Sequence, residues 1–258
     1  MFACTPALSS AALCVVALAC APGTVLAAKA STPTRLELRA GARVGIVNQL
    51  DAEVTHFHAA KQIENSFLKT YPVKWPVSLM LLEAVQDRLK QLGLVAVQVA
   101  TSDELLRARE HCFLDAALGK GLPKECAPLF ARLAAAEHLD AIIVLGPGRN
   151  DSTHAGGTRH KALPEYLRGW CFVTGQGGAD TLPSLLNLTE LLLIGVNGQA
   201  AQLIDRQWGG NGQSWLGYKA PADLKAFPEQ QLAQLQPLFA YMLKQQSDAL
   251  LAHLEAAR

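Results

Sequence analysis

Apolar residues recur along the chain with the spacing of strands in some segments and of helices in others. Short apolar runs and alternating segments predict strands, and these lie at Val44–Val47, Asp51–Ala59, Val95–Val99, Ala141–Leu145, Leu167–Thr174 and Leu191–Val196. The segment Asp51–Ala59 is expected to pair with Val44–Val47 as a second strand. Asn197 and Gly198 separate two strand-like runs, and this dipeptide is a strong signal for a β-hairpin.

Helical spacing is clearest between Val77 and Leu92, where the apolar residues fall on one face. Gly93 is expected to end this helix, because glycine accepts the left-handed conformation that follows many helices. Thr101 and Glu104 form a capping-box pattern, which predicts the start of another helix. Further helices are predicted at Leu129–His138 and over most of Leu224–Ala257, which Pro228 and Pro237 divide.

The order of these elements favours an α/β fold with a single mixed sheet. Its early units alternate strand and helix, as parallel βαβ units do, and its later part contains an antiparallel hairpin. Helices are expected to cover the sheet. We predict one domain over residues 44–258, preceded by an extended lead-in over residues 29–43.

The first 28 residues contain no charged residue and differ from the rest of the chain. An apolar run at Ala11–Ala21 is followed by Pro22 and Gly23, and then by small residues up to Ala28. This pattern predicts a secretory signal peptide over residues 1–28, and therefore a protein of the periplasm or cell envelope. Cys20 lies in a loose lipobox, so the alternative is an outer-membrane lipoprotein, which would contact the membrane only through its lipid.

Three cysteines follow the predicted leader: Cys112, Cys126 and Cys171. Cys112 and Cys126 bracket a short segment with two glycines and a proline, so they are candidates for a disulfide in an oxidising compartment. Two buried free thiols are the alternative. Cys171 lies in an apolar run and is predicted to be a buried thiol. The sequence has no CxxC pair, which argues against a thioredoxin-like site and a zinc knuckle.

Charge and glycine patterns exclude several classes of function. The chain has 23 Lys and Arg against 22 Asp and Glu, which gives a net charge of +1. Nucleic-acid binding requires clustered basic residues, so no nucleic acid is expected as a partner. The glycine-containing segments Leu145–Gly148 and Val173–Gly178 follow strands, but neither continues as a dinucleotide-binding loop does. We interpret both as turns and predict no cofactor.

His56 and His58 are two residues apart in a predicted strand, which places both rings on one face. They are therefore candidates for two metal ligands. A third ligand would have to arrive through the fold, and the candidates are His154, His160, Asp151 and Cys171. Ordinary surface histidines of a sheet are the simpler interpretation. A periplasmic binder of a metal or small ligand is one alternative function.

The sequence contains no recognisable catalytic motif. No GxSxG motif is present, and the scattered Asp and Glu residues indicate no glycosidase pair. An envelope hydrolase whose site is assembled only by the fold is a second alternative function. Tyr71 and Trp75 each precede a proline, in a segment that we do not expect to be regular, and aromatic side chains on a stiff loop are candidates for a contact surface. Packing of both rings against the edge of the sheet is the alternative.

Several segments together resemble a bacterial envelope α/β domain, and they are Arg43–Val47, Leu89–Leu94, Ala136–Gly146 and Ala201–Asp205. This domain occurs in the curli secretion lipoprotein, in outer-membrane activators of penicillin-binding proteins and in the N-terminal domain of TolB. The resemblance covers most of Arg43–Gly209 as a spaced pattern of elements. It implies a non-enzymatic binding or assembly role, with another envelope protein or a second copy of the chain as partner.

Overall fold

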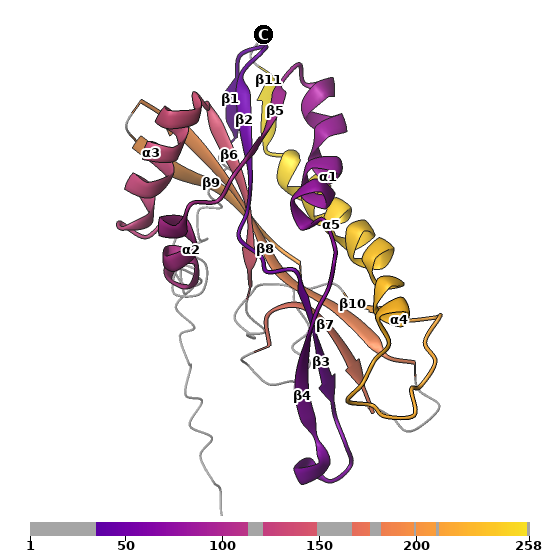
Figure 1. Ribbon diagram of the computed structural model, residues 1–258. Coiled ribbons are helices and arrows are strands. Elements are labelled where there is room, and N and C mark those ends of the chain that lie inside the picture. Colours follow the sequence, from indigo (N-terminus) through magenta and orange to yellow (C-terminus); the bar gives the residue numbers. More distant parts are fainter. Residues whose placement is uncertain are drawn as a thin grey trace, which may run out of the picture. The chain divides into compact units, whose positions relative to one another are not determined.

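The computed structural model describes residues 35–112, 121–148, 167–175, 182–198, 200–209 and 212–256. These residues form a mixed α/β fold in which helices flank a large mixed sheet, as the sequence predicts (Figure 1). The strands are β1 (Leu36–Leu38), β2 (Arg43–Asn48), β3 (Glu53–His58), β4 (Phe67–Pro72), β5 (Val95–Val99), β6 (Ala141–Pro147), β7 (Gly169–Thr174), β8 (Ser184–Asn197), β9 (Ala200–Trp208), β10 (Gly212–Ser214) and β11 (Leu254–Ala256). The helices are η1 (Ile63–Asn65), α1 (Val77–Gln91), α2 (Asp103–Glu110), α3 (Cys126–Glu137), α4 (Glu229–Ala233) and α5 (Gln236–Leu251).

The long strand β8 is shared by two halves of the sheet. The strand order is β5-β2-β6-β8-β9 in the first half and β4-β3-β7-β8-β10 in the second. β2 is parallel to β5 and β6, whereas β8 is antiparallel to each of its neighbours. The predicted hairpin joins β8 to β9, with Asn197 paired to Ala200, so the late antiparallel part of the fold is confirmed.

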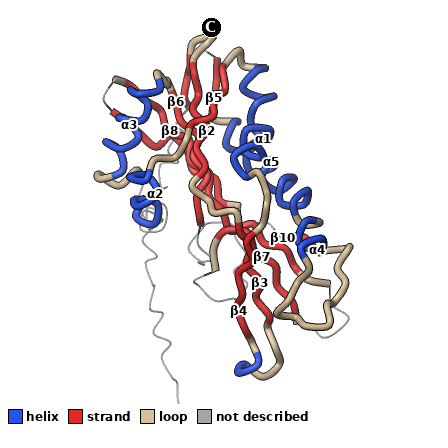
Figure 2. The backbone as a smooth tube through the Cα atoms, in the orientation of Figure 1, coloured by secondary structure: helices blue, strands red, loops and turns tan. Residues whose placement is uncertain are grey.

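The first half of the sheet contains a reversal of strand order. The chain passes from β2 through α1 to β5 on one side of β2, and then through α2 and α3 to β6 on its other side. α1 and α3 therefore lie on opposite faces of the sheet (Figure 2). In open α/β sheets, such a reversal leaves a crevice beyond the carboxyl ends of the two central strands, and ligands bind there.

Alternation along the central strands fills a core on each face of the sheet. In β6, Ile143 and Leu145 pack toward α1 and α5, while Ile142 and Val144 pack toward α2 and α3. All four side chains are completely buried. A strand that is buried on both faces reads as a continuous apolar run, which is why the sequence predicts β6 so clearly.

The ends of two helices test the local predictions. α1 ends as predicted, because Gly93 follows it with a φ of +68°. The cap of α2 differs: the Ser102 hydroxyl accepts a hydrogen bond from the Leu105 N–H at 3.2 Å, and Thr101 is not the cap. Thr101 instead donates to the Asn48 carbonyl at 2.5 Å, which ties the start of α2 to the end of β2.

Four short strands are not predicted by the sequence, and they are β1, β4, β10 and β11. β1 and β11 pair in parallel, so part of the predicted lead-in binds the end of the predicted C-terminal helical segment. β4 includes Tyr71 and Pro72, in a segment expected to be irregular, because it is an edge strand and an edge strand tolerates proline. The expected pairing of β3 with β2 is wrong, since β3 pairs with β4 and β7.

Every described strand beside β8 is interrupted at the level of Leu188 and Thr189, which we call the junction. Thr189 pairs with the last residue of β6, Pro147, and Leu188 pairs with the first residue of β7, Gly169. β2 ends and β3 begins at the same level, and β9 ends and β10 begins there too. Only β8 continues through the junction among the described strands, so its neighbours are free to diverge there.

On one face of the sheet, a side chain of α5 closes the junction. Gln246 is 4% exposed, and its amide nitrogen donates to the Gln207 carbonyl at 2.7 Å and lies 3.3 Å from the Thr189 carbonyl. Its amide oxygen accepts from Asn187 Nδ2 at 3.1 Å. These bonds occupy polar groups that would otherwise be buried without partners where the strands break. The opposite face of the junction carries a pocket.

Candidate functional site

A polar pocket of about 300 Å³ lies where β2 and β6 end and β3 and β7 begin. We call it the junction pocket, and it is lined by Leu50, Asp51, Glu53, Thr55, Leu68, Thr70, Arg109, Glu110, Pro147, Leu167, Arg168, Gly169 and Trp170. It lies at the carboxyl ends of the parallel strands β2 and β6, between which the strand order reverses. This is the position at which open α/β sheets bind ligands.

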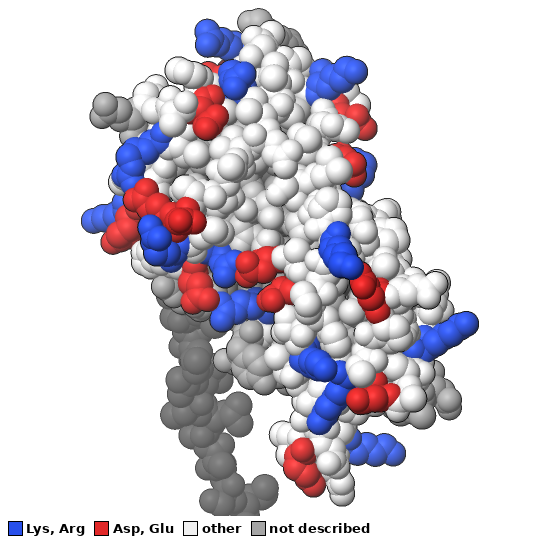
Figure 3. Space-filling view, in the orientation of Figure 1, with Lys and Arg blue, Asp and Glu red and all other residues white. Residues whose placement is uncertain are grey.

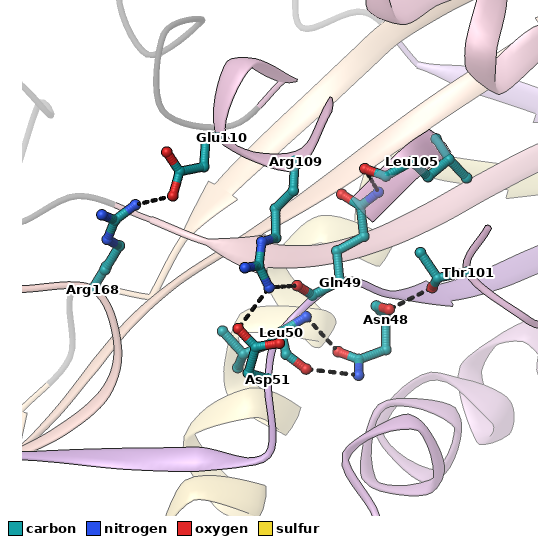
Figure 4. A network of polar contacts seen from close by, with 9 residues as sticks. All are labelled: Asn48, Gln49, Leu50, Asp51, Thr101, Leu105, Arg109, Glu110 and Arg168. Carbon is teal, nitrogen blue, oxygen red and sulfur yellow. Dashed lines mark hydrogen bonds and ion pairs between the residues drawn. The ribbon is translucent and has the colours of Figure 1, made fainter. Parts of the chain in front are cut away.

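The loop after β2 brings its polar residues to the pocket. Asn48 makes two hydrogen bonds of 3.0 Å with the backbone of Leu50, which turns the chain sharply at the end of the strand. Gln49 is buried, and its amide nitrogen donates to the Leu105 carbonyl of α2 at 3.1 Å. The loop is therefore held on both sides, and Asp51 emerges at the pocket (Figure 4).

Two arginine–carboxylate pairs form the charged wall of the pocket. Arg109 Nη1 donates to the Asp51 carboxylate at 2.7 Å and to the Gln49 carbonyl at 3.1 Å. Arg168, just before β7, donates to Glu110 at 3.0 Å. Figure 4 shows Arg109 directed toward the loop after β2, and Arg168 directed toward Glu110 on α2. Acidic and basic side chains gather below α2 at the level of the junction (Figure 3).

Glu53 adds a carboxylate at the start of β3. Burial raises the pKa of Glu53, and the negative charge of Asp51 raises it further, while Arg109 opposes both effects. Thr55 and Thr70 continue the polar lining, with their hydroxyl oxygens 3.4 Å apart across β3 and β4. The pocket thus combines charges of both signs with neutral hydroxyl groups.

A disulfide fixes the helix that carries Arg109 and Glu110. Cys112 follows α2 and is bonded to Cys126, the first residue of α3, with sulfur atoms 2.06 Å apart. The predicted pair is therefore confirmed by the structure. Cys171 is a buried free thiol, also as predicted, and burial raises its pKa to about 12.

Replacing both Cys112 and Cys126 by Ser is expected to lower the free energy of unfolding by about 3 kcal/mol. The two residues are 14 apart in sequence, and closing a loop of that length removes this much unfolded-chain entropy in the standard model. For a chain of this size, the melting temperature should fall by roughly 6–12 °C. Thermal unfolding of both proteins with and without dithiothreitol measures the effect. A parent protein that dithiothreitol does not destabilise would contradict it, and the variant should not respond to the reductant.

The structure buries His56 in an aromatic cluster, while the neighbouring His58 is half-buried. His56 is 0% exposed, stacks on Phe172 with ring centroids 4.4 Å apart, and also contacts Phe67 and Phe227. Burial, together with the charge of the neighbouring His58, lowers the pKa of His56 to about 3. The side chain is therefore neutral at physiological pH. It is not an exposed sheet histidine, because the segment around Phe227 covers this face of β3.

His56 and His58 do lie on the same face of β3, and both meet one hydroxyl. Thr174 Oγ1 lies 2.7 Å from His56 Nε2 and 2.8 Å from His58 Nδ1. A hydroxyl has one hydrogen, so it donates to one imidazole and accepts from the other. Chelation of a metal by the same nitrogens would require Thr174 to move aside, and that hypothesis stays a prediction.

The proposed third ligands do not join the histidines in the described part of the chain. Cys171 on β7 pairs with Thr55 on β3, the residue next to His56. Cys171 therefore faces the opposite side of the sheet from His56. The described residues contain no group of three or more His, Cys, Asp or Glu side chains placed to share an ion. His154, His160 and Asp151 lie outside the described residues, as do the predicted signal peptide and Cys20.

The expected contact surface of Tyr71 and Trp75 is wrong, because both rings are buried. Tyr71 is 7% exposed and packs near Phe172 and Phe227, while Trp75 is 6% exposed and packs on Trp170. Once β4 pairs with β3, the chain that follows folds back under α5, and both rings enter the core. This corresponds to the alternative of packing against the sheet.

The glycine after β6 serves packing. A Cβ atom at Gly148 would lie 1.9 Å from the ring of Trp208, so only glycine fits beside this side chain. The predicted turn is wrong for Leu145–Pro147, because these residues still pair with β8 as the last part of β6. Residues 176–178 of the second segment lie outside the described residues.

The residues of the junction pocket were not identified by sequence patterns. Asp51 and Glu53 lie in a predicted strand, and Arg109 and Glu110 lie in a predicted helix with no motif around them. One signal was available, because polar residues directly after a buried parallel strand point to the carboxyl edge of a sheet. Asn48, Gln49 and Asp51 follow the Val44–Val47 run in this way.

No protein-family model and no curated protein matches the chain. A search of solved structures gave the 1.65 Å structure of the hypothetical protein CT253 from Chlamydia trachomatis, with 8% sequence identity and a TM-score of 0.38. The match covers 83% of this chain and 98% of that chain. Within the described residues, no helix has the length and apolarity needed to cross a membrane. The resemblance to envelope α/β domains stays a prediction.

Proposed function

We propose that this protein is an exported module of the bacterial cell envelope that binds a ligand in the junction pocket and acts without catalysis. The observation that carries the proposal is the pocket itself, which lies at the strand-order reversal and is lined by five charged side chains. Four of its five charged groups are held in pairs by hydrogen bonds, and a disulfide lies next to the helix that carries two of them, so the pocket is largely formed before a ligand arrives. Such preorganisation favours binding.

Export is supported by the cysteines and by the first 28 residues. Disulfides form and persist in oxidising compartments, such as the periplasm. The Cys112–Cys126 bond joins α2 to α3 close to Arg109 and Glu110, which line the pocket. A leader over residues 1–28 would deliver the chain to such a compartment. A lipid on Cys20 would anchor the same module to a membrane.

The test is chemical-shift mapping on the isotope-labelled mature protein with the small-molecule fraction of its host's envelope. Perturbed amides at Leu50–Thr55, Arg109–Glu110 and Leu167–Trp170 are expected, because these residues line the pocket. Shifts confined to other parts of the protein, or no shifts, would contradict the assignment of the pocket. The mass of the protein recovered from the same host tests export, since the chain should lack its leader and be two mass units lighter than the dithiol.

A further inference from the structure

We infer that the junction pocket takes a small zwitterionic ligand, with a carboxylate and an ammonium group in one molecule, as in a free dipeptide. This inference rests on the proposed function and specifies the class of ligand. It follows from the charges that line the pocket, the bonds that those charges already make, and the volume and apolar part of the lining.

The balance of charge favours a ligand with both signs. The lining contains three carboxylates, Asp51, Glu53 and Glu110, and two guanidiniums, Arg109 and Arg168, so its net charge is −1 when all are ionised. A polyanion would meet three like charges, and a polycation would meet two. A zwitterion gains an opposite charge for each of its ends, since the charges are held in place by the fold.

The guanidiniums retain donors for a ligand carboxylate. Arg109 makes both of its hydrogen bonds to described residues through Nη1, and Arg168 binds Glu110 through Nη1 as well. A guanidinium has five N–H groups in a planar fork that matches the geometry of a carboxylate. Each arginine therefore has further N–H groups that can bind a ligand without breaking its existing pair.

Glu53 is suited to the ammonium group. Among the described residues it has no ion-pair partner within 4.0 Å, in contrast to Asp51 and Glu110. Glu53 is exposed, and its partial burial and the charge of Asp51 raise its pKa more than Arg109 lowers it. A ligand ammonium would supply the missing positive charge and would favour the ionised carboxylate. The hydroxyls of Thr55 and Thr70 offer further polar contacts for the same end of the ligand.

Size and apolar lining set the scale of the ligand. A volume of about 300 Å³ is at the small end for ligand pockets, and it excludes large cofactors. Leu50, Leu68, Leu167 and Pro147 line the same pocket and can cover short aliphatic groups. A dipeptide with small side chains has the required combination of two charged ends and an apolar middle.

Isothermal titration calorimetry of the mature, oxidised protein with L-alanyl-L-alanine tests the inference. The free dipeptide should bind, and its N-acetylated and C-amidated forms should each bind at least roughly tenfold more weakly, because each has lost one charge-assisted hydrogen-bonding end. Glu53→Gln should weaken the free dipeptide by roughly tenfold and should leave the N-acetylated form unaffected. Arg168→Gln should likewise weaken the free dipeptide by roughly tenfold and should leave the C-amidated form unaffected.

Matched control variants separate the pocket from general charge effects. Arg107→Gln removes an arginine of α2 that does not line the pocket, and Glu64→Gln removes an exposed carboxylate of η1. Both should bind the free dipeptide as the parent does. Equal binding of free and blocked dipeptides, or no binding of the free dipeptide, would overturn the zwitterion inference. If envelope extract still perturbs the pocket amides in that case, the proposed function stands with another ligand. If the extract has no effect either, both fail.

Discussion

Replacing Arg206 by Ala is expected to lower the free energy of unfolding by about 3–5 kcal/mol. Arg206 on β9 lies 3.0 Å from the Glu190 carboxylate on β8, and the two side chains are only 14% and 1% exposed. Removing the guanidinium takes a counter-charge away from a carboxylate that is almost completely shielded from water. Urea denaturation at pH 7, followed by tryptophan fluorescence, measures the loss.

The chain contains a matched surface pair that serves as control. Lys244 and Asp248 are 3.2 Å apart on α5 and more than half exposed, so Lys244→Ala should cost less than about 1 kcal/mol. Replacing Glu190 and Arg206 together by Leu and Met should recover most of the stability lost in Arg206→Ala, because both buried charges are then removed. A cost for Arg206→Ala that does not exceed the cost for Lys244→Ala would show that the pair is solvated.

The sequence predicts the central strands because their side chains alone decide their environment. β6 and residues Leu191–Val196 of β8 are apolar at every position, and such runs are stable only inside a covered sheet. β4 and β11 are different, since they depend on the pairing of distant segments. Leu254 forms a strand only because Leu36 is brought beside it, and no local pattern contains that information.

The candidate site shows the same division between local and distant causes. The disulfide was predictable from two cysteines close in sequence. The junction pocket was not, because Asp51, Arg109 and Arg168 come from segments that meet only once β2, α2 and β7 are in place. The two histidines share a face as the sequence predicts, but the burial of His56 depends on Phe227, more than 160 residues further along the chain.

The aromatic cluster around His56 makes stability depend on pH. In the unfolded chain the pKa of His56 is near 6.5, and in the folded protein burial lowers it to about 3. At pH values between these two pKa values, His56 binds a proton in the unfolded state but not in the folded state, so acid favours unfolding. The contribution of His56 is complete above pH 6.5 and is lost as the pH falls toward 3, at up to about 1.4 kcal/mol per pH unit.

His56→Phe removes this titration while keeping a ring that can stack on Phe172. Between pH 6 and pH 4.5, the parent should lose about 2 kcal/mol more unfolding free energy than the variant does. Urea denaturation of both proteins at these two pH values gives the difference directly. His138→Asn is the matched control: His138 is exposed and has a φ of +55°, which asparagine tolerates. This control should lose as much unfolding free energy between the two pH values as the parent does. An equal loss in His56→Phe would contradict the prediction, because it would mean that burial does not keep His56 from binding a proton in the folded protein.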